Sequence, residues 1–140
     1  QNIISEIIKC DKIHLAERCR PMTTQKQTIG KLGEELAVAY LQKNGYRIIT
    51  TNWRCKWGEI DIIADDGQEV VFVEVKTRRA FLTESVFENI TPAKMKKVIY
   101  SAYSYAEENR ILTWRIDAIG ILLSAKSSPQ IEHIKNAFIE

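Results

Sequence analysis

Acidic residues and a lysine interrupt two apolar segments that otherwise have the pattern of β-strands. The segments comprise Ile60, Ile62 and Ile63, and then residues 70–75, with an Asp-Asp-Gly turn signal at 65–67 between them. Because side chains alternate along a strand, we expect Glu59 and Asp61 to share one face. Glu74 and Lys76 share a face of the second segment for the same reason. Paired strands lie ~4.8 Å apart, so these four side chains would meet in one small patch of sheet.

Carboxylates that converge without a nearby histidine are typical of a site for a hard divalent cation. Mg²⁺ prefers oxygen ligands and needs only one or two protein carboxylates when waters and a phosphate oxygen complete its coordination shell. Hydrolysis of a phosphodiester requires a metal, an activated water and a positive charge near the phosphorus. Asp61, Glu74 and Lys76 can supply the groups for all three from two paired strands.

The composition is that of one soluble domain. The 140 residues are 45% hydrophobic and 27% charged, and the net charge of +2 permits a nucleic-acid partner without requiring one. No apolar run approaches the ~18 residues of a membrane span, so we expect a cytoplasmic protein that does not contact a membrane. The cysteines suggest no disulfide framework. Zinc binding by Cys10, His14 and Cys19 is disfavoured, because zinc sites use tighter spacing and a fourth ligand.

Residues 1–27 differ in pattern from the rest of the chain, and we expect them to be an N-terminal extension and linker before a domain at residues 28–140. Isoleucines at helical spacing predict a short helix in this extension, which Pro21 would end. Met22 is a candidate for the natural start of the protein, with the preceding residues lying upstream of it.

Apolar periodicity and capping signals predict the elements of the domain. A first helix is expected over residues 28–44, with Thr28 as N-cap and a stop at Asn44-Gly45. Glycines 30 and 33 weaken it by ~1 kcal/mol each relative to alanine, which indicates close approach to a neighbour. A second helix is expected to begin at Thr91-Pro92 and to end near residue 109. Besides the two acid-bearing segments, strands are expected at 46–53, 114–123 and 131–134, with loops at 54–58 and 77–90.

The order is therefore helix, three strands, helix, strand and a last short strand. This order predicts an α/β fold of the mixed (α+β) kind, in which helices pack on the faces of a central sheet. The right-handed crossover rule places the strand at 114–123 parallel to one of the first three strands.

Ordered blocks across residues 28–138 resemble the YraN-like (UPF0102) family. The blocks are Gly-Lys-Leu-Gly-Glu at 30–34, Trp-Gly-Glu-Ile-Asp at 57–61, Val-Phe-Val-Glu-Val-Lys at 71–76, Ile-Thr-Pro-Ala-Lys at 90–94, Arg-Ile-Asp at 115–117 and His-Ile-Lys-Asn-Ala-Phe at 133–138. Asp61 followed by Glu74-x-Lys76 also resembles the signature of PD-(D/E)xK nucleases, with Ile60 where the name of the motif places proline. The family is similar to archaeal Holliday-junction resolvases, which implies a restriction-endonuclease-like core.

The resemblance implies a role for each acidic residue and for the lysine. Asp61 and Glu74 would bind Mg²⁺ or Mn²⁺, and Lys76 would be the charged catalytic partner. Glu34 would be an additional acid on the first helix, and Glu59 an auxiliary acid beside Asp61.

Four basic residues are candidates for contact with nucleic-acid phosphates. Arg78 and Arg79 come directly after the acidic site, on an expected loop. Lys94 and Lys97 lie near the start of the second helix, where the helix dipole favours phosphate, but they also fit a solvated helix face.

Other residues are interpreted mainly as structural. Asp117 either serves the site or pairs with Arg115, and pairing is the favoured interpretation. His133 is expected to be structural. Core packing is favoured over base stacking for the tryptophans Trp53, Trp57 and Trp114.

The leading hypothesis is a Mg²⁺-dependent nuclease-like protein that binds DNA, including branched DNA, and hydrolyses phosphodiesters. The alternative is a non-catalytic nucleic-acid-binding or interaction module that retains the nuclease fold, and a third hypothesis is a structural protein with an idle site. The likeness to resolvases also implies a homodimer, although no segment of the sequence indicates an interface.

Overall fold

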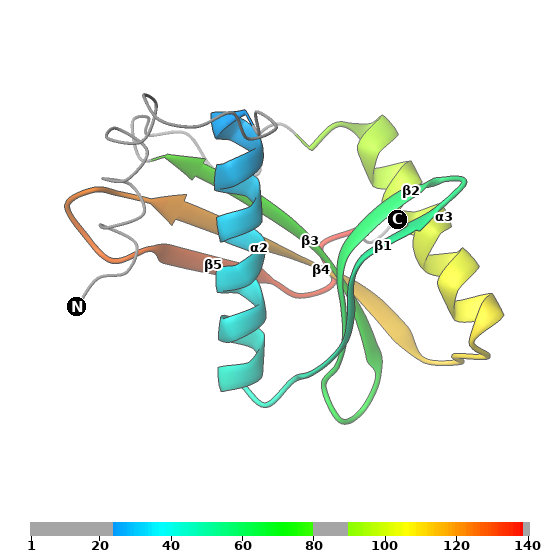
Figure 1. The fold of residues 1–140 in the computed structure, drawn as a ribbon. Coiled ribbons are helices and arrows are strands. Elements are labelled where there is room, and N and C mark those ends of the chain that lie inside the picture. The colour runs from blue at the N-terminus through cyan, green and yellow to red at the C-terminus, as the bar shows by residue number, and fades with distance from the viewer. Residues whose placement is uncertain (1–23, 80–89, 139–140) are drawn as a thin grey trace, which may run out of the picture.

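In the computed structural model, which describes residues 24–79 and 90–138, the chain forms a mixed five-stranded sheet with a helix on each face (Figure 1). The elements are α2 (Gln25–Lys43), β1 (Arg47–Cys55), β2 (Gly58–Asp65), β3 (Val70–Arg79), α3 (Pro92–Glu108), β4 (Trp114–Leu123) and β5 (Gln130–Ile134). The predicted order of elements and the predicted fold class are confirmed. The expectations for the extension before Thr24, including its helix and its cysteines, lie outside the described residues, as does most of the expected loop at 77–90.

Strand β3 lies at the centre of the sheet, whose order is β1-β2-β3-β4-β5. It pairs antiparallel with β2 and parallel with β4, which confirms the predicted crossover through α3. The outer strands β1 and β5 pair antiparallel with β2 and β4. No helix in the part of the chain that the structure describes is long and apolar enough to cross a membrane.

Helix α2 begins earlier than predicted, because its N-cap is Thr24 and not Thr28. The Thr24 side chain accepts a hydrogen bond from the backbone N–H of Gln27, and the Gln27 side chain accepts one from the backbone N–H of Thr24. This reciprocal capping box satisfies two N–H groups at the helix start. The predicted stop is confirmed, since Asn44 is the C-cap and Gly45 has a φ of +87°.

The two faces of the sheet carry separate apolar cores. Leu32, Ala37 and Leu41 of α2 pack on the buried side chains of one face. Val98, Ala102 and Tyr105 of α3 cover the other face. Of the tryptophans, Trp53 and Trp114 pack against the core under α3, as predicted. Trp57 does not pack in this core. It lies in the exposed turn formed by residues 56 and 57, between the end of β1 at Cys55 and the start of β2.

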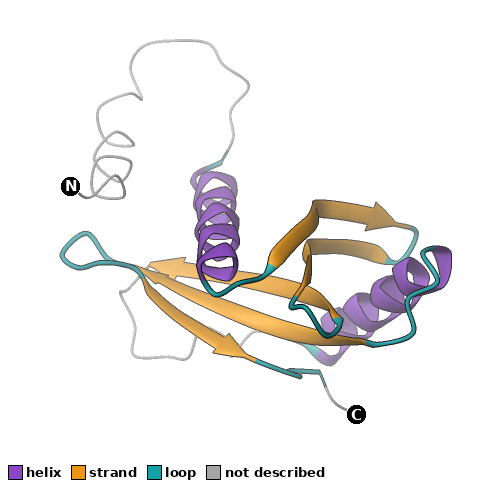
Figure 2. Ribbon diagram, turned by 90° about the horizontal axis from the view of Figure 1, so that it is seen from below, coloured by secondary structure: helices purple, strands orange, loops and turns teal. Residues whose placement is uncertain are grey.

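The β1–β2 pair bends at the level of Asp61. Ile60 packs in the core under α3, whereas Ile62 packs in the core under α2, so the regular alternation of side chains fails between them. Opposite this point, Asn52 has a positive φ of 51°. Figure 2 shows the ends of β1 and β2 turning out of the plane of the other strands toward α3. The bend places Asp61 where the β1–β2 pair turns away from the other strands.

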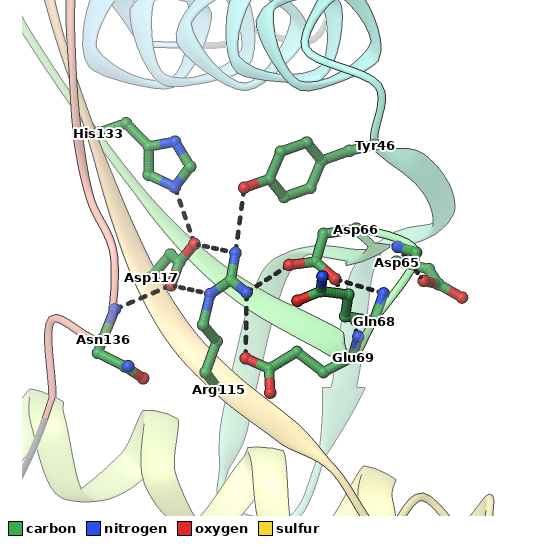
Figure 3. Close-up of polar contacts among 10 residues, drawn as sticks. Tyr46, Asp65, Asp66, Gln68, Glu69, Arg115, Asp117, His133 and Asn136 are labelled. Atoms are coloured by element: carbon green, nitrogen blue, oxygen red, sulfur yellow. Dashed lines mark hydrogen bonds and ion pairs between the residues drawn. The ribbon is translucent and has the colours of Figure 1, made fainter.

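A buried polar network fastens the β2–β3 turn to β4 and β5 (Figure 3). Arg115 donates hydrogen bonds to both carboxylate oxygens of Asp117 (3.0 and 3.3 Å), and it forms ion pairs with Asp66 and Glu69 of the turn. Asp117 also accepts a hydrogen bond from the backbone N–H of Asn136 and contacts the His133 ring at 2.8 Å. These cationic and N–H partners lower the pKa of Asp117, although its burial opposes that shift. The structural interpretation of Asp117 is therefore supported.

Helix α2 approaches β3 closely at Gly33. A Cβ atom at this position would lie 1.7 Å from Oγ1 and 2.8 Å from Cβ of Thr77. The expected close approach is therefore present at Gly33. A Cβ placed on Gly30 would have no heavy atom of the described residues within 4 Å, apart from the backbone of its own helix.

We predict that Gly33→Ala lowers the free energy of unfolding by ~1–3 kcal/mol, the usual cost of overpacking. The matched control is Gly30→Ala in the same helix, which should leave stability unchanged or raise it by up to ~1 kcal/mol through helix propensity. Urea denaturation of both variants checks this. Equal stability of the two variants would contradict the close packing of α2 on β3.

Candidate active site

Asp61 and Glu74 come together on the adjacent strands β2 and β3. Asp61 accepts a hydrogen bond from the backbone N–H of Val75 through Oδ2, at 2.8 Å. Glu74 is only 5% exposed, and its Oε2 has no hydrogen-bond partner among the described residues. A buried carboxylate oxygen without a donor is costly, and it commonly marks a position where a cation or proton is needed.

The surroundings of this pair favour protonation of the two carboxyl groups. Burial is the largest cause, and together with the negative charge of Glu74 it raises the pKa of Asp61 to about 8. Burial also raises the pKa of Glu74, against the opposing effect of Lys94 and of a hydrogen bond from Asp61. A proton on one of the two carboxyl groups removes one of the two negative charges and so relieves their repulsion.

Lys94 reaches the pair from the first turn of α3. Its Nζ lies 3.3 Å from Oε1 of Glu74, although 45% of the lysine side chain remains exposed. Thr91 positions this turn by accepting a hydrogen bond from the backbone N–H of Lys94, with Pro92 next to it, as the sequence predicted. The sequence indicated a phosphate contact for Lys94 and gave no sign that it pairs with Glu74, since the contact depends on packing across the sheet.

A cavity of about 700 Å³ opens over the pair. It is lined by Asp61, by residues 74–79 at the end of β3, and by the first turns of α2, including Glu34. Lys76, Arg78 and Arg79 all lie on this lining, because β3 continues to Arg79 instead of ending in the predicted loop. The cavity is therefore lined by the half-buried Asp61, the buried Glu74 and several cationic side chains.

Glu59 lies outside this lining, where two residues of β1 hold it. Asn52 donates through Nδ2 to Oε1 of Glu59 (3.1 Å) and to Oε2 of Glu34 (2.9 Å). Arg54 lies 3.3 Å from the other oxygen of Glu59. Asn52 thus joins Glu59 to Glu34, which lines the cavity together with Asp61. That Glu59 and Asp61 share one face stays a prediction. Asn52 is a site residue that sequence reasoning missed, and its left-handed backbone gave no signal in the sequence.

Lys97 and His133 have neighbours other than the acidic pair. Lys97 is exposed on α3 and lies beside Gly58 at the β1–β2 turn. His133 contacts Asp117 and, through its other ring nitrogen, the Tyr40 hydroxyl at 3.3 Å. The histidine thus belongs to the network around Arg115, which agrees with its expected structural role.

The donor set fits a hard divalent cation more closely than zinc. Within residues 24–79 and 90–138, no three His, Cys, Asp or Glu side chains converge closely enough to form a metal site by themselves. Mg²⁺ needs only one or two protein carboxylates when water and phosphate supply the remaining oxygens. Asp61 and Glu74 provide that number of carboxylates, and Glu34 lies on the same cavity and contributes negative charge at Asp61.

The molecule thus has a mixed α/β fold with an acidic pair, Asp61 and Glu74, on two adjacent strands of its sheet. Residues 33–121 match the uncharacterised protein family UPF0102, and the chain belongs to that family. A UPF0102 protein of Renibacterium salmoninarum is 41% identical over 112 residues, covering 79% of this chain and 95% of that protein. A UPF0102 protein of Chloroflexus aurantiacus is 39% identical over 116 residues, covering 81% and 94%. Among solved structures, a Holliday junction resolvase of Archaeoglobus fulgidus matches with a TM-score of 0.42 and 18% identity, covering 74% of this chain and 75% of that chain.

We predict that Asp61 makes the stability of the metal-free protein fall as the pH rises. The folded protein keeps a proton on Asp61 up to a pKa of about 8, whereas the unfolded chain releases it near 3.8. The stabilisation by this proton is therefore complete below the unfolded-state pKa of 3.8, and it is lost as the pH rises through the folded-state pKa of about 8. Asp61→Asn should remove this pH dependence. At about pH 9 its free energy of unfolding should exceed that of the wild type by more than ~1 kcal/mol, since each pKa unit corresponds to ~1.4 kcal/mol.

Denaturant unfolding of both proteins in chelator, between about pH 5 and pH 9, measures this difference. Glu35→Gln, which removes one charge from an exposed position of α2, is the matched control and should behave like the wild type. Parallel pH profiles for Asp61→Asn and the wild type would contradict the buried, protonated state of Asp61.

Proposed function

We propose that this protein is a Mg²⁺-dependent nuclease that binds DNA, including branched DNA, and hydrolyses its phosphodiester bonds. The observation that supports this most is the acidic pair of the half-buried Asp61 and the buried Glu74, which lines an open cavity together with cationic side chains. The resemblance of Asp61 and Glu74-x-Lys76 to the PD-(D/E)xK signature supports the same reaction.

Each residue would have a role that its position allows. Asp61 and Glu74 would hold a Mg²⁺ or Mn²⁺ ion, which when bound polarises the phosphate and lowers the pKa of an attacking water. Lys76, on the same cavity, would place its ammonium group beside the charge that develops on the phosphate oxygens. Arg78 and Arg79 would hold the neighbouring phosphates of the strand. Glu34 would orient water from the α2 side of the cavity, with Asn52 fixing its carboxylate.

Lys94 would act as the counter-charge of the metal-free site. Its ammonium group neutralises part of the charge of Glu74, and its exposed side chain has room to turn toward a phosphate when a metal binds. Lys97, one turn further along α3, would extend this phosphate-binding row.

We predict that Asp61→Asn lowers the rate of DNA cleavage roughly 100-fold or more, the scale of losing a group that stabilises developing charge. Initial rates on branched, single-stranded and duplex DNA with Mg²⁺ or Mn²⁺ measure the effect. Glu35→Gln makes the same charge change on an exposed part of α2 and should keep wild-type activity. Equal rates for Asp61→Asn and the control would refute the assignment of the active site.

A second prediction concerns metal binding without turnover. Because Mg²⁺ must displace the proton from Asp61, its apparent affinity should rise with pH up to about 8. The slope should approach ~10-fold per pH unit if one proton is released. The increase in melting temperature with Mg²⁺ concentration, measured at several pH values, gives this affinity. If Mg²⁺ raises the melting temperature independently of pH, or still raises it in Asp61→Asn, the metal binds elsewhere.

The Lys94–Glu74 ion pair favours a second candidate function, a non-catalytic nucleic-acid-binding module. In that case the lysine permanently takes the place of the metal charge. DNA binding that weakens steeply with salt, without cleavage under either metal and without stabilisation by metal, would distinguish this function from the nuclease.

A further inference from the structure

Two aromatic rings lie exposed together where the β1–β2 turn meets α3. Trp57 is 43% exposed and Tyr100 is 49% exposed. Their ring centroids are 5.1 Å apart, with the planes tilted by 43°. Exposed aromatic side chains that gather at one place are unfavourable in water, and they commonly mark a binding surface.

Rigid contacts hold these rings in place. Beside Trp57, the turn is anchored to α3 by the Cys55 thiol, which donates to the buried Ser101 hydroxyl at 3.5 Å. A Cβ placed on Gly58 would lie 3.7 Å from Cβ of Lys97 and 3.7 Å from Oγ of Ser101, so the turn lies close to α3. The ring pair is therefore presented by the end of a hairpin and a helix that are already ordered, which limits the entropy lost on binding.

Lysines surround the ring pair and connect it to the acidic site. The Nζ atom of Lys56 lies 5.0 Å from the Trp57 ring centroid. On α3, Lys97 precedes Tyr100 by three residues and comes three residues after Lys94, and residues at this spacing are neighbours on a helix surface. The six-residue rise from Lys94 to Tyr100 corresponds to ~9 Å along the helix axis. A row of cations thus runs from Glu74 to the rings.

From this arrangement we propose that Trp57 and Tyr100 form a stacking platform for unpaired bases, with Lys97 and Lys94 holding the phosphates that lead to the acidic pair. Stacking on aromatic rings requires an exposed base face, so the strand bound here is single-stranded or unpaired at a branch. The proposal rests on the proposed function, because the bound strand would follow the lysine row from the rings to the candidate cleavage site. The lysines argue against a protein partner, since lysine is depleted at protein–protein interfaces.

The test measures binding of the full chain in chelator, so that hydrolysis cannot contribute. The probes are a fluorescent short oligodeoxythymidylate, an abasic strand of the same length, and a duplex of that length. The wild type should bind the oligodeoxythymidylate roughly 5- to 150-fold more tightly than the abasic strand, the range expected for aromatic stacking. Trp57→Ala should remove most of that preference and leave the affinity for the abasic strand unchanged, whereas Trp57→Phe should retain it.

Leu112→Ala is the matched control, because Leu112 is 96% exposed and lies outside the ring pair. It should bind both strands like the wild type. Equal affinity of the wild type for the abasic and base-containing strands would overturn the platform. The platform would also be overturned if the wild type is a dimer, and Trp57→Ala makes it a monomer that keeps the preference for bases. The rings would then belong to a subunit interface.

The outcomes for the platform and for the nuclease are separate. Loss of base preference in Trp57→Ala, combined with no cleavage under either metal, supports the platform and refutes the nuclease. Cleavage that depends on Asp61, combined with an unchanged base preference in Trp57→Ala, refutes the platform alone.

Discussion

Two carboxyl groups, the half-buried Asp61 and the buried Glu74, meet on adjacent strands, and much of the surrounding structure serves this unfavourable contact. The β2–β3 pairing brings the two strands together, and the backbone N–H of Val75 fixes the Asp61 carboxyl group. Lys94 supplies one positive charge from α3. Burial and the remaining repulsion raise the pKa of Asp61 to about 8, which leaves the pair ready to exchange a proton for a cation.

The two helices contribute differently to the site. Helix α2 packs closely on β3 at Gly33 and forms one wall of the cavity with its first turns. Helix α3 brings Lys94 to Glu74 and, two turns later, Tyr100 to Trp57. The Arg115 network lies at the β2–β3 turn, where it joins that turn to β4 and β5.

The sequence allowed most of the fold to be predicted, because apolar periodicity and capping residues are local signals. The start of α3 at Thr91-Pro92 and the parallel strand β4 are examples. Features that depend on tertiary geometry could not be predicted. Asn52 bridges Glu34 and Glu59 from a left-handed conformation that its residue type alone does not reveal. Lys94 was expected at a phosphate, and only packing across the sheet places it on Glu74.

The most direct test of a metal site at the acidic pair is a crystal structure of the protein grown with Mn²⁺, analysed by anomalous diffraction. We expect one strong anomalous peak between the carboxylates of Asp61 and Glu74, with Lys94 moved away from Glu74. A map without a peak at this pair, in crystals where Glu74 still contacts Lys94, would contradict the metal site and with it the proposed hydrolysis.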